Sequence, residues 1–289
     1  METAPECLDC FRTQAEQTLG LTGITPREIA DIMLQVEVFL ADLKNHLSPP
    51  EHAEILYARL AEWSGCPDPY QQIKESGNRF AQALLPEVTQ ILTEAEDPLF
   101  CAIQATLAGN MIDYGAQHRF DLASILDRFR ETIPVINDYD LFRRELREAS
   151  SILYLADNCG EIILDGLLIE ALNRPTTMVV RSRSVINDAT LDDAISCGLD
   201  RICRVIGNGT GCPGTPLRNC SQELQELFGT ADIVISKGQG NFETLTEVER
   251  PVYFLLTVKC PVVAAHLTEL SQGKKIQLGD TIFMRFPGR

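Results

Sequence analysis

The amino-acid sequence predicts a mostly parallel, Rossmann-like α/β sheet domain over residues 151–289, with a helical domain over residues 1–150 packed on it. From Ser151 onward, short apolar runs rich in β-branched residues alternate with glycine-containing polar loops and helical patterns. This alternation is typical of βαβ units in a parallel sheet. Before Ser151, apolar residues recur at the three-to-four spacing of helices, and no convincing strand appears. A chain of 289 residues suits two packed units of this kind.

In the first half of the chain, apolar residues have helical spacing in segments such as 26–34 and 80–85. Helix boundaries are expected at Ser48-Pro49, Gly65 to Pro69 and Asp97-Pro98, because Pro is favoured at early helical positions and Ser or Asp at the cap. These patterns predict about six helices.

In the second half, five runs predict the core strands of the sheet. They cover residues 152–155, 177–180, 201–206, 232–235 and 252–256. A last stretch, residues 275–284, is expected to form a strand at the edge of the sheet.

The charge of the chain restricts the classes of partner. A formal net charge of −16 disfavours nucleic-acid binding, which needs clustered Lys and Arg. An acidic protein that handles phosphorylated substrates needs a local cation, and a bound metal is the simplest source. The sequence shows no apolar run of 18 residues, and residues 1–6 do not resemble a signal peptide. We therefore expect a cytoplasmic protein with neither nucleic-acid nor membrane partners, while the oligomeric state stays open.

A polar segment follows each of the five predicted core strands. Because ligands of open α/β sheets bind outside the carboxyl ends of the strands, these segments are expected to meet at one site. They are residues 157–161, 181–188, 207–211 and 236–243, with Lys259 after the fifth strand.

Asp157, Asn158 and Asp188 follow two neighbouring predicted strands and offer hard oxygen ligands. Carboxylate and amide oxygens suit Mg, Mn and similar divalent ions. Either Asp alone is better explained as a helix cap, but the joint pattern favours a metal site. A metal ion there could polarise a phosphoryl oxygen and lower the pKa of a bound water.

Lys237 and Lys259 are expected to supply positive charge beside a phosphate group. The backbone of Gly238 and Gly240 could approach the phosphate closely enough to donate N–H groups. A Gly-x-Gly sequence alone is weak evidence, since most such sequences are only turns.

Three of these segments resemble the domain of unknown function 89 family, also called damage-control phosphatases. They are Ala156-Asp157-Asn158-Cys159-Gly160-Glu161, Val185-Ile186-Asn187-Asp188-Ala189-Thr190 and Ile235-Ser236-Lys237-Gly238-Gln239-Gly240-Asn241-Phe242-Glu243. Residues 109–115 and the start Cys7-Leu8-Asp9-Cys10 resemble its smaller prokaryotic branch.

This resemblance implies a metal-dependent phosphatase that hydrolyses phosphate esters of sugars, nucleotides or cofactor intermediates with Mn, Ni, Co or Mg. It places the metal ligands at Asp157, Asn158 and Asp188. For a hydrolase we expect catalytic roles at Asp157, Asp188 and Lys237. The expected substrate-binding residues are Glu161, Ser236, Lys237, Gly238, Asn241 and Lys259.

Two further features have weaker interpretations. Residues 109–115 carry two glycines within a helical region, which fits either a close backbone approach to the site or a plain helix–helix contact. In the first case Asn110 and Asp113 are candidates for supporting contacts at the site. Cys7 and Cys10 could hold a second, structural metal, with Cys66 as a further ligand. Because zinc needs four ligands and no second C-x-x-C follows, free thiols are the favoured interpretation.

Two other functions fit parts of the pattern. A doubly wound sheet also suits an adenosylmethionine-dependent carboxyl methyltransferase. That class predicts a glycine-rich first loop and an acidic end of the second strand, whereas the first loop here is Asp157 to Glu161 and the second is basic. A non-catalytic protein that binds sugar phosphates or metal would share the same site residues.

Overall fold

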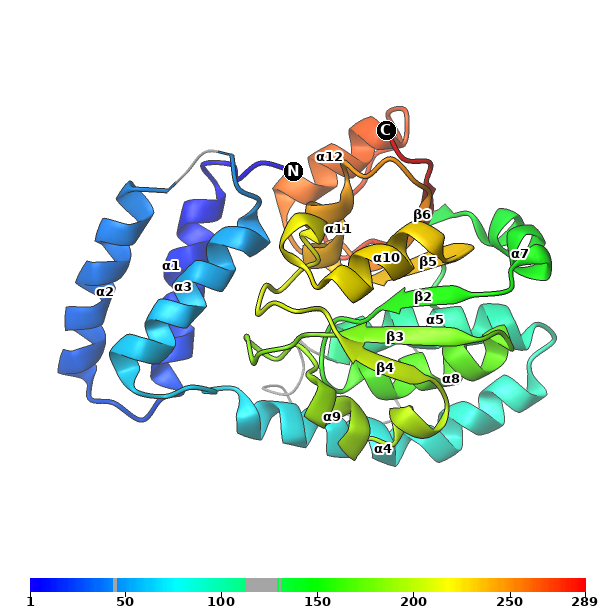
Figure 1. Ribbon diagram of the computed structural model, residues 1–289, viewed down its shortest axis with the longest axis horizontal. Helices are drawn as coiled ribbons and strands as arrows, with labels where there is room; N and C mark the ends of the chain where they lie inside the picture. The colour runs from blue at the N-terminus through cyan, green and yellow to red at the C-terminus, as the bar shows by residue number, and fades with distance from the viewer. Residues whose placement is uncertain (44–45, 113–128, 130) are drawn as a thin grey trace.

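The computed structural model describes residues 1–43, 46–112, 129 and 131–289. Its central element is a seven-stranded sheet with the strand order β1-β7-β6-β5-β2-β3-β4 (Figure 1). Neighbouring strands are parallel except β6 and β7, which are antiparallel. The strands are β1 (Ile136–Asn137), β2 (Ile152–Leu155), β3 (Thr176–Val180), β4 (Arg204–Gly207), β5 (Ile233–Lys237), β6 (Val252–Thr257) and β7 (Thr281–Phe286).

The five predicted core strands correspond to β2 through β6, and the mixed α/β class is confirmed. Two details of the strand prediction are wrong. β7 is not the edge strand, because it lies between β6 and β1. The first half of the chain does contain a strand, β1, in which Ile136 pairs with Ile282. Two residues are too few to show a period in the sequence, and they are extended here because β7 offers backbone partners.

The described helices of the first half are α1 (Cys7–Gly20), α2 (Pro26–Ala41), α3 (Pro49–Ser64), α4 (Gln71–Glu94), α5 (Pro98–Ile112) and α7 (Tyr139–Glu148). Helices α3, α4 and α5 begin at or just after the predicted boundary signals. Ser48 caps α3 in a capping box with Glu51, and α3 ends at Gly65, whose φ of 68° suits glycine. Asp97 accepts a hydrogen bond from the Phe100 N–H at 3.1 Å at the start of α5.

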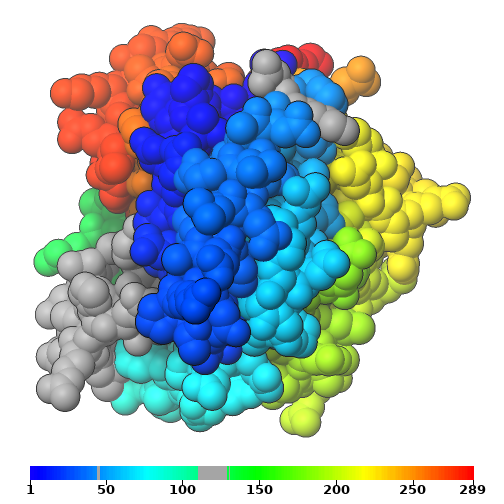
Figure 2. Space-filling model, turned by 90° about the vertical axis from the view of Figure 1, so that its left-hand side faces the viewer, coloured from blue at the N-terminus to red at the C-terminus, as the bar shows by residue number. Residues whose placement is uncertain are grey.

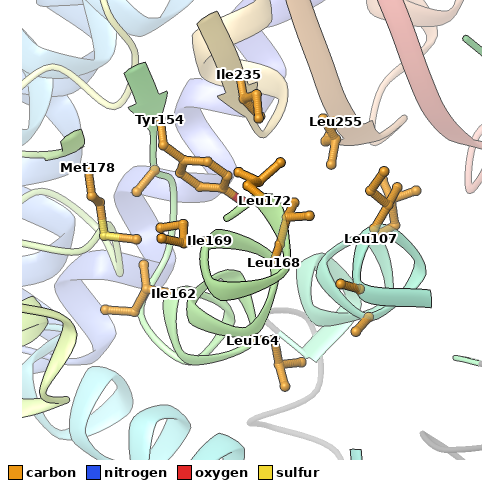
Figure 3. Close-up of a cluster of buried hydrophobic side chains, with 14 of the residues drawn as sticks. Leu107, Tyr154, Ile162, Leu164, Leu168, Ile169, Leu172, Met178, Ile235 and Leu255 are labelled. Carbon is orange, nitrogen blue, oxygen red and sulfur yellow. The ribbon is translucent and has the colours of Figure 1, made fainter. Parts of the chain in front are cut away.

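Helices cover both faces of the sheet. The second half contributes α8 (Glu161–Leu172), α9 (Leu191–Ser196), α10 (Gln222–Thr230), α11 (Gln239–Leu245) and α12 (Pro261–Leu270), with short 3₁₀ turns at Leu199–Arg201 and Leu217–Asn219. Successive strand residues point to opposite faces, so Tyr154 packs with α4, α5, α7 and α8, and Leu153 packs with α10, α11 and α12. Figure 3 shows the first of these cores, where Tyr154, Met178, Ile235 and Leu255 meet Leu168 and other α8 side chains.

A third apolar core belongs to α1, α2 and α3, which lie side by side at the left in Figure 1. Figure 2 shows the same three helices, in blue, on the side of the molecule that faces the viewer. Glu54 of α3 accepts hydrogen bonds from the Gly211 N–H at 3.0 Å and from Arg183 at 2.9 Å. These three helices therefore lie against loops that follow β3 and β4.

The three apolar cores do not divide the helices at residue 150, the predicted domain boundary. Side chains of α4, α5 and α7, among them Leu84, Leu107 and Phe142, share the core of the sheet. The division into domains 1–150 and 151–289 stays a prediction. Over the described part of the chain, no helix is both long enough and apolar enough to cross a membrane.

Candidate active site

The loops after β2 and β3 pair with each other through their backbones. Cys159 N–H donates to the Asn187 carbonyl at 2.9 Å, and Ala189 N–H donates to the Asp157 carbonyl at 2.9 Å. Asn158 and Asp188 form an isolated antiparallel bridge between these bonds. The three residues predicted as metal ligands are thereby brought together.

Asp157 and Asp188 are both buried, and their charges act on each other. Burial and then the neighbouring charges of Asp188 and Glu161 raise the pKa of Asp157 well above its ordinary value, although Arg181 and Lys259 oppose the rise. The Asn158 side-chain amide donates to Asp157 Oδ2 at 3.1 Å. A further cation between these carboxylates would reduce their mutual repulsion.

The chemistry of this donor set fits a hard divalent ion, because it consists of two carboxylates and an amide oxygen. Within the described residues, no three His, Cys, Asp or Glu side chains are grouped so that they could hold a metal ion. An ion between Asp157 and Asp188 would therefore need Asn158 and non-protein ligands to complete its shell. The ligand assignment stays a prediction.

Gly238 makes room for the Asp157 carboxylate. Its φ is +79°, and a Cβ at this position would lie 1.9 Å from Asp157 Oδ2, so any side chain there would displace the carboxylate. The Gly238 N–H donates to the Leu255 carbonyl at 2.9 Å. At Gly240, a Cβ would lie 2.0 Å from the Pro213 carbonyl oxygen. The close approaches seen at both glycines are to protein atoms, and the expected contact with phosphate is untested.

Arg181, which follows β3, is a central residue of the site that the sequence interpretation did not select. Its side chain is 1% exposed, and its Nε donates to Asp188 Oδ2 at 2.6 Å. Its Nη1 donates to the Gly214 carbonyl at 3.0 Å and to Asn241 Oδ1 at 3.1 Å. Its Nη2 lies 3.6 Å from Asp157 Oδ1. The basic character of the loop after β3 is the sequence signal that points to Arg181.

Asn241 connects several parts of the site. Its Nδ2 donates to the carbonyls of Ala156 at 3.0 Å and Lys237 at 2.8 Å. Its Oδ1 accepts from Arg181 and from the Thr215 hydroxyl, the latter at 2.7 Å. These bonds to Asn241 hold the ends of β2 and β5 beside Arg181, while its predicted contact with substrate is untested.

Lys237, at the end of β5, lies in a buried ionic cluster with Glu161 and Asp165 of α8. Its Nζ lies 2.6 Å from Asp165 Oδ1, 3.0 Å from Glu161 Oε2 and 3.5 Å from the Thr106 carbonyl. Burial acts to lower the pKa of Lys237, but the two carboxylates outweigh it and raise that pKa above its ordinary value. Its three N–H groups thus face protein acceptors. A direct contact with phosphate would require Lys237 to leave one of them.

Glu161 couples this cluster to the predicted metal loop. Its Oε1 accepts the Asn158 backbone N–H at 3.0 Å while its Oε2 accepts from Lys237. Burial acts to raise the pKa of Glu161, but Lys237 and Lys259 lower it below its ordinary value. Burial also raises the pKa of Asp165 to about 6, against the effect of Lys237.

Ser236 and Lys259 are the two remaining residues that the sequence predicts to bind substrate. Ser236 is fully buried, and its hydroxyl has no hydrogen-bond partner. Lys259 follows β6 and is half-buried; its backbone N–H donates to Gln239 Oε1 at 2.9 Å. It lies close enough to Asp157 to oppose the rise in pKa that burial and Asp188 cause.

Helix α4 contacts the loop after β2 and the start of α9. Asn78 Oδ1 accepts the Gly160 N–H at 2.6 Å, and Lys74 Nζ lies 2.9 Å from Asp193 Oδ2. Asp193 in turn accepts from the Thr190 hydroxyl at 2.6 Å. No sequence signal indicated these contacts, because Asn78 lies 82 positions before Gly160.

The cysteines predicted as a second metal site are on the first turns of α1. Cys10 is exposed and Cys7 is half-buried, and burial raises the pKa of Cys7 to about 11. Thr3 bonds to Leu47, near the start of α3, whereas Cys66 follows the end of α3. A helix of 16 residues is about 24 Å long, so Cys66 does not share a site with Cys7 and Cys10. Asp113 and the side chain of Asn110 lie outside the described residues.

Comparisons with known proteins agree with the three motifs. A family model described as the damage-control phosphatase ARMT1-like domain matches residues 3–274. A damage-control phosphatase of Archaeoglobus fulgidus is 33% identical over 278 residues, which cover 91% of this chain and 94% of that protein. A damage-control phosphatase of Pyrococcus horikoshii is 29% identical over 293 residues, which cover 99% and 98% of the two chains.

The fold agrees as well. The crystal structure of a DUF89 family protein from Pyrococcus horikoshii has a TM-score of 0.89 to this chain at 28% identity, and the match covers 99% of both chains. The resemblance predicted from the sequence motifs is confirmed. Since the family model spans nearly all of its length, the chain belongs to the damage-control phosphatase ARMT1-like (DUF89) family.

Proposed function

We propose that this protein is a divalent-metal-dependent phosphatase that hydrolyses monoesters of small phosphorylated metabolites. The observation that carries the proposal is the pairing of the loops after β2 and β3, which groups Asp157, Asn158 and Asp188 beside the buried guanidinium of Arg181. Two relatives that match nearly the whole chain are named damage-control phosphatases, which supports the phosphatase assignment over a methyltransferase.

In the proposed mechanism, Asp157, Asn158 and Asp188 hold the ion. When bound, a divalent ion such as Mn, Ni, Co or Mg supplies Lewis-acid polarisation of a phosphoryl oxygen and a more acidic water. The two carboxylates also accept hydrogen bonds from the attacking water and so orient it toward phosphorus. Positive side chains beside Asp157 stabilise the charge that develops on the phosphoryl group.

Sugar phosphates, nucleotides and phosphate esters related to cofactors are the proposed substrate class, with removal of damaged metabolites as the proposed role. The net charge of −16 makes nucleic acid an unfavourable partner. We further propose that the protein acts in the cytoplasm. Its oligomeric state is left open.

A metal-by-substrate screen tests the proposal. Purified protein is stripped with chelator and its metal content is verified. Hydrolysis of p-nitrophenyl phosphate and of a panel of sugar phosphates and nucleotides is then measured with Mg, Mn, Co or Ni added. We expect hydrolysis to disappear on chelation and to return with at least one ion.

A matched pair of variants separates the site from the surface. Asp157→Asn should lose most of the activity, whereas Asp192→Asn, at an exposed position on α9, should retain it. Full activity in verified metal-free protein would disprove metal dependence. Metal binding without turnover of any ester would favour a non-catalytic binding protein, and methyl transfer from adenosylmethionine to a carboxylate would favour the transferase.

A further inference from the structure

We infer that Arg181 binds the phosphoryl group of the substrate, a role that the sequence predicted for Lys237 and Lys259. The inference rests on the proposed phosphatase function and identifies the cation that recognises its substrate. It starts from one observation: Arg181 is 1% exposed, yet its Nη2 has no hydrogen-bond partner.

The rest of the guanidinium is firmly held. Nε donates to Asp188 at 2.6 Å, and Nη1 donates to the Gly214 carbonyl and to Asn241 at 3.0 and 3.1 Å. Nη2 lies 3.6 Å from Asp157 Oδ1, which is too far for a hydrogen bond. An Nη atom carries two N–H donors. Leaving buried donors of a charged group unpaired is costly, so an acceptor is expected at this position.

A phosphoryl oxygen is the acceptor that this position suits best. Arg181 contacts both Asp157 and Asp188, so an ion held by those carboxylates would be its neighbour. An anionic group shared between that ion and Arg181 would meet positive charge on two sides. The planar guanidinium also matches the spacing of phosphate oxygens better than an ammonium group does.

Two other basic side chains near the site have protein partners. Lys237 directs its three N–H groups at Glu161, Asp165 and the Thr106 carbonyl. Arg183, two residues after Arg181, is 69% exposed and pairs with Glu54. Arg183 is therefore a matched control, since it has the same charge and lies on the same loop.

The test measures phosphate and metal binding separately in Arg181→Gln, Arg181→Lys and Arg183→Gln. Calorimetry gives the affinity for Mn²⁺ without phosphate, and then the affinity of the Mn²⁺-loaded protein for inorganic phosphate. We expect Arg181→Gln to bind phosphate at least tenfold more weakly. Its affinity for Mn²⁺ should be unchanged or higher, because a positive charge beside the ion has been removed. Arg181→Lys should fall between, and Arg183→Gln should behave as the parent.

A loss of phosphate affinity without a loss of Mn²⁺ affinity separates substrate binding from mere support of Asp188. If Arg181 only positions that carboxylate, the affinity for Mn²⁺ should fall together with that for phosphate, and this result would overturn the inference. Phosphate affinity within twofold of the parent in Arg181→Gln would also overturn it. If Arg181→Gln does not fold, the same two criteria apply to Arg181→Lys, where a threefold loss of phosphate affinity at unchanged metal affinity is expected.

The proposed function can fail independently of this role. A parent protein that binds phosphate through Arg181 but hydrolyses no ester would exclude the phosphatase and keep the anion site. If the parent hydrolyses esters and Arg181→Gln retains its kcat/KM within twofold, the phosphatase stands and the role of Arg181 is excluded.

Discussion

A bound metal ion would reduce the repulsion between the negative charges of Asp157 and Asp188. Both carboxylates are buried, and Arg181 is shared unequally between them, at 2.6 Å from Asp188 and 3.6 Å from Asp157. A single buried cation does not balance two carboxylates, which is consistent with the raised pKa of Asp157 that burial and Asp188 cause. The charge of each residue is therefore the property to change first.

Asp188→Asn keeps the shape of the side chain and removes one negative charge. If Asp188 ligates the ion, the affinity for Mn²⁺ should fall at least about tenfold, on the order of 1.4 kcal/mol. Excess metal should then recover part of the phosphatase rate. Isotherms for the parent and the variant check this, and equally tight binding by the variant would remove Asp188 from the ligand set.

Lys237→Met removes the cation between two buried carboxylates of α8. Because uncompensated buried charge is strongly destabilising, the free energy of unfolding should fall by about 3–5 kcal/mol. If Lys237 also contacts phosphate, its loss should reduce the transition-state stabilisation measured by kcat/KM by about 2–4 kcal/mol in the protein that remains folded. Urea unfolding measures the loss of stability. Kinetics at urea concentrations below the unfolding transition measure the loss of catalytic efficiency, so the two effects are separated.

A double-mutant cycle with Asp165→Asn gives the control for Lys237. Removing both partners should cost less than the sum of the single changes, since the loss of Lys237 then no longer leaves Asp165 unpaired and only Glu161 keeps an unbalanced charge. Strict additivity would contradict the ion pair, and an unchanged kcat/KM would contradict the catalytic role predicted for Lys237.

Among the elements, α11 carries a titratable group that the proposed mechanism does not use. Glu243 is buried and accepts from Gln239 Nε2 at 3.0 Å, and burial raises its pKa to about 7. A carboxyl whose folded-state pKa lies above its unfolded value stabilises the fold when protonated. That contribution is complete below about pH 4.5 and is lost as the pH rises through about 7.

Glu243→Gln should remove this dependence on pH. We expect the parent to lose on the order of 2–3 kcal/mol of unfolding free energy between pH 4.5 and 8 through Glu243, and the variant to lose less by that amount. Urea unfolding at the two pH values measures the difference. Glu247→Gln, at an exposed position near α11, should keep the parent's dependence; equal curves for the parent and Glu243→Gln would refute the assignment.

Cys7 and Cys10, on the first turns of α1, are the residues through which the predicted second metal site can be tested. Cys10 is exposed, and no metal-holding group of three side chains occurs among the residues described here. We therefore expect the double variant Cys7→Ser, Cys10→Ser to keep the metal content and the melting temperature of the parent. Loss of one equivalent of zinc by elemental analysis, with a lower Tm, would instead establish a structural metal.

At the scale of the whole molecule, α1, α2 and α3 have their own core, whereas α4, α5 and α7 share that of the sheet. The first three helices contact the loops after β3 and β4 through α3, where Glu54 bonds to Gly211 and Arg183. Helix α4 holds the loop after β2 through Asn78. The candidate site is thus supported by two helical groups that belong to different cores.

Local sequence predicted most of the elements and the first set of candidate site residues. The β-branched runs predicted β2 through β6, and the Ser48 and Asp97 signals predicted the starts of α3 and α5, because caps and strand patterns act over a few residues. Asp157, Asn158 and Asp188 could be found because both of their loops follow strands that are neighbours in the sheet.

Only the tertiary structure decided where the basic side chains point. Lys237 ends a strand, and the face that it takes brings it to Asp165, 72 positions earlier, and away from Arg181. Arg181 acquires its environment from Gly214 and Asn241, 33 and 60 positions later. A buried charge is placed by partners that satisfy it, and when those partners are distant in the chain, no local pattern of residue types identifies them.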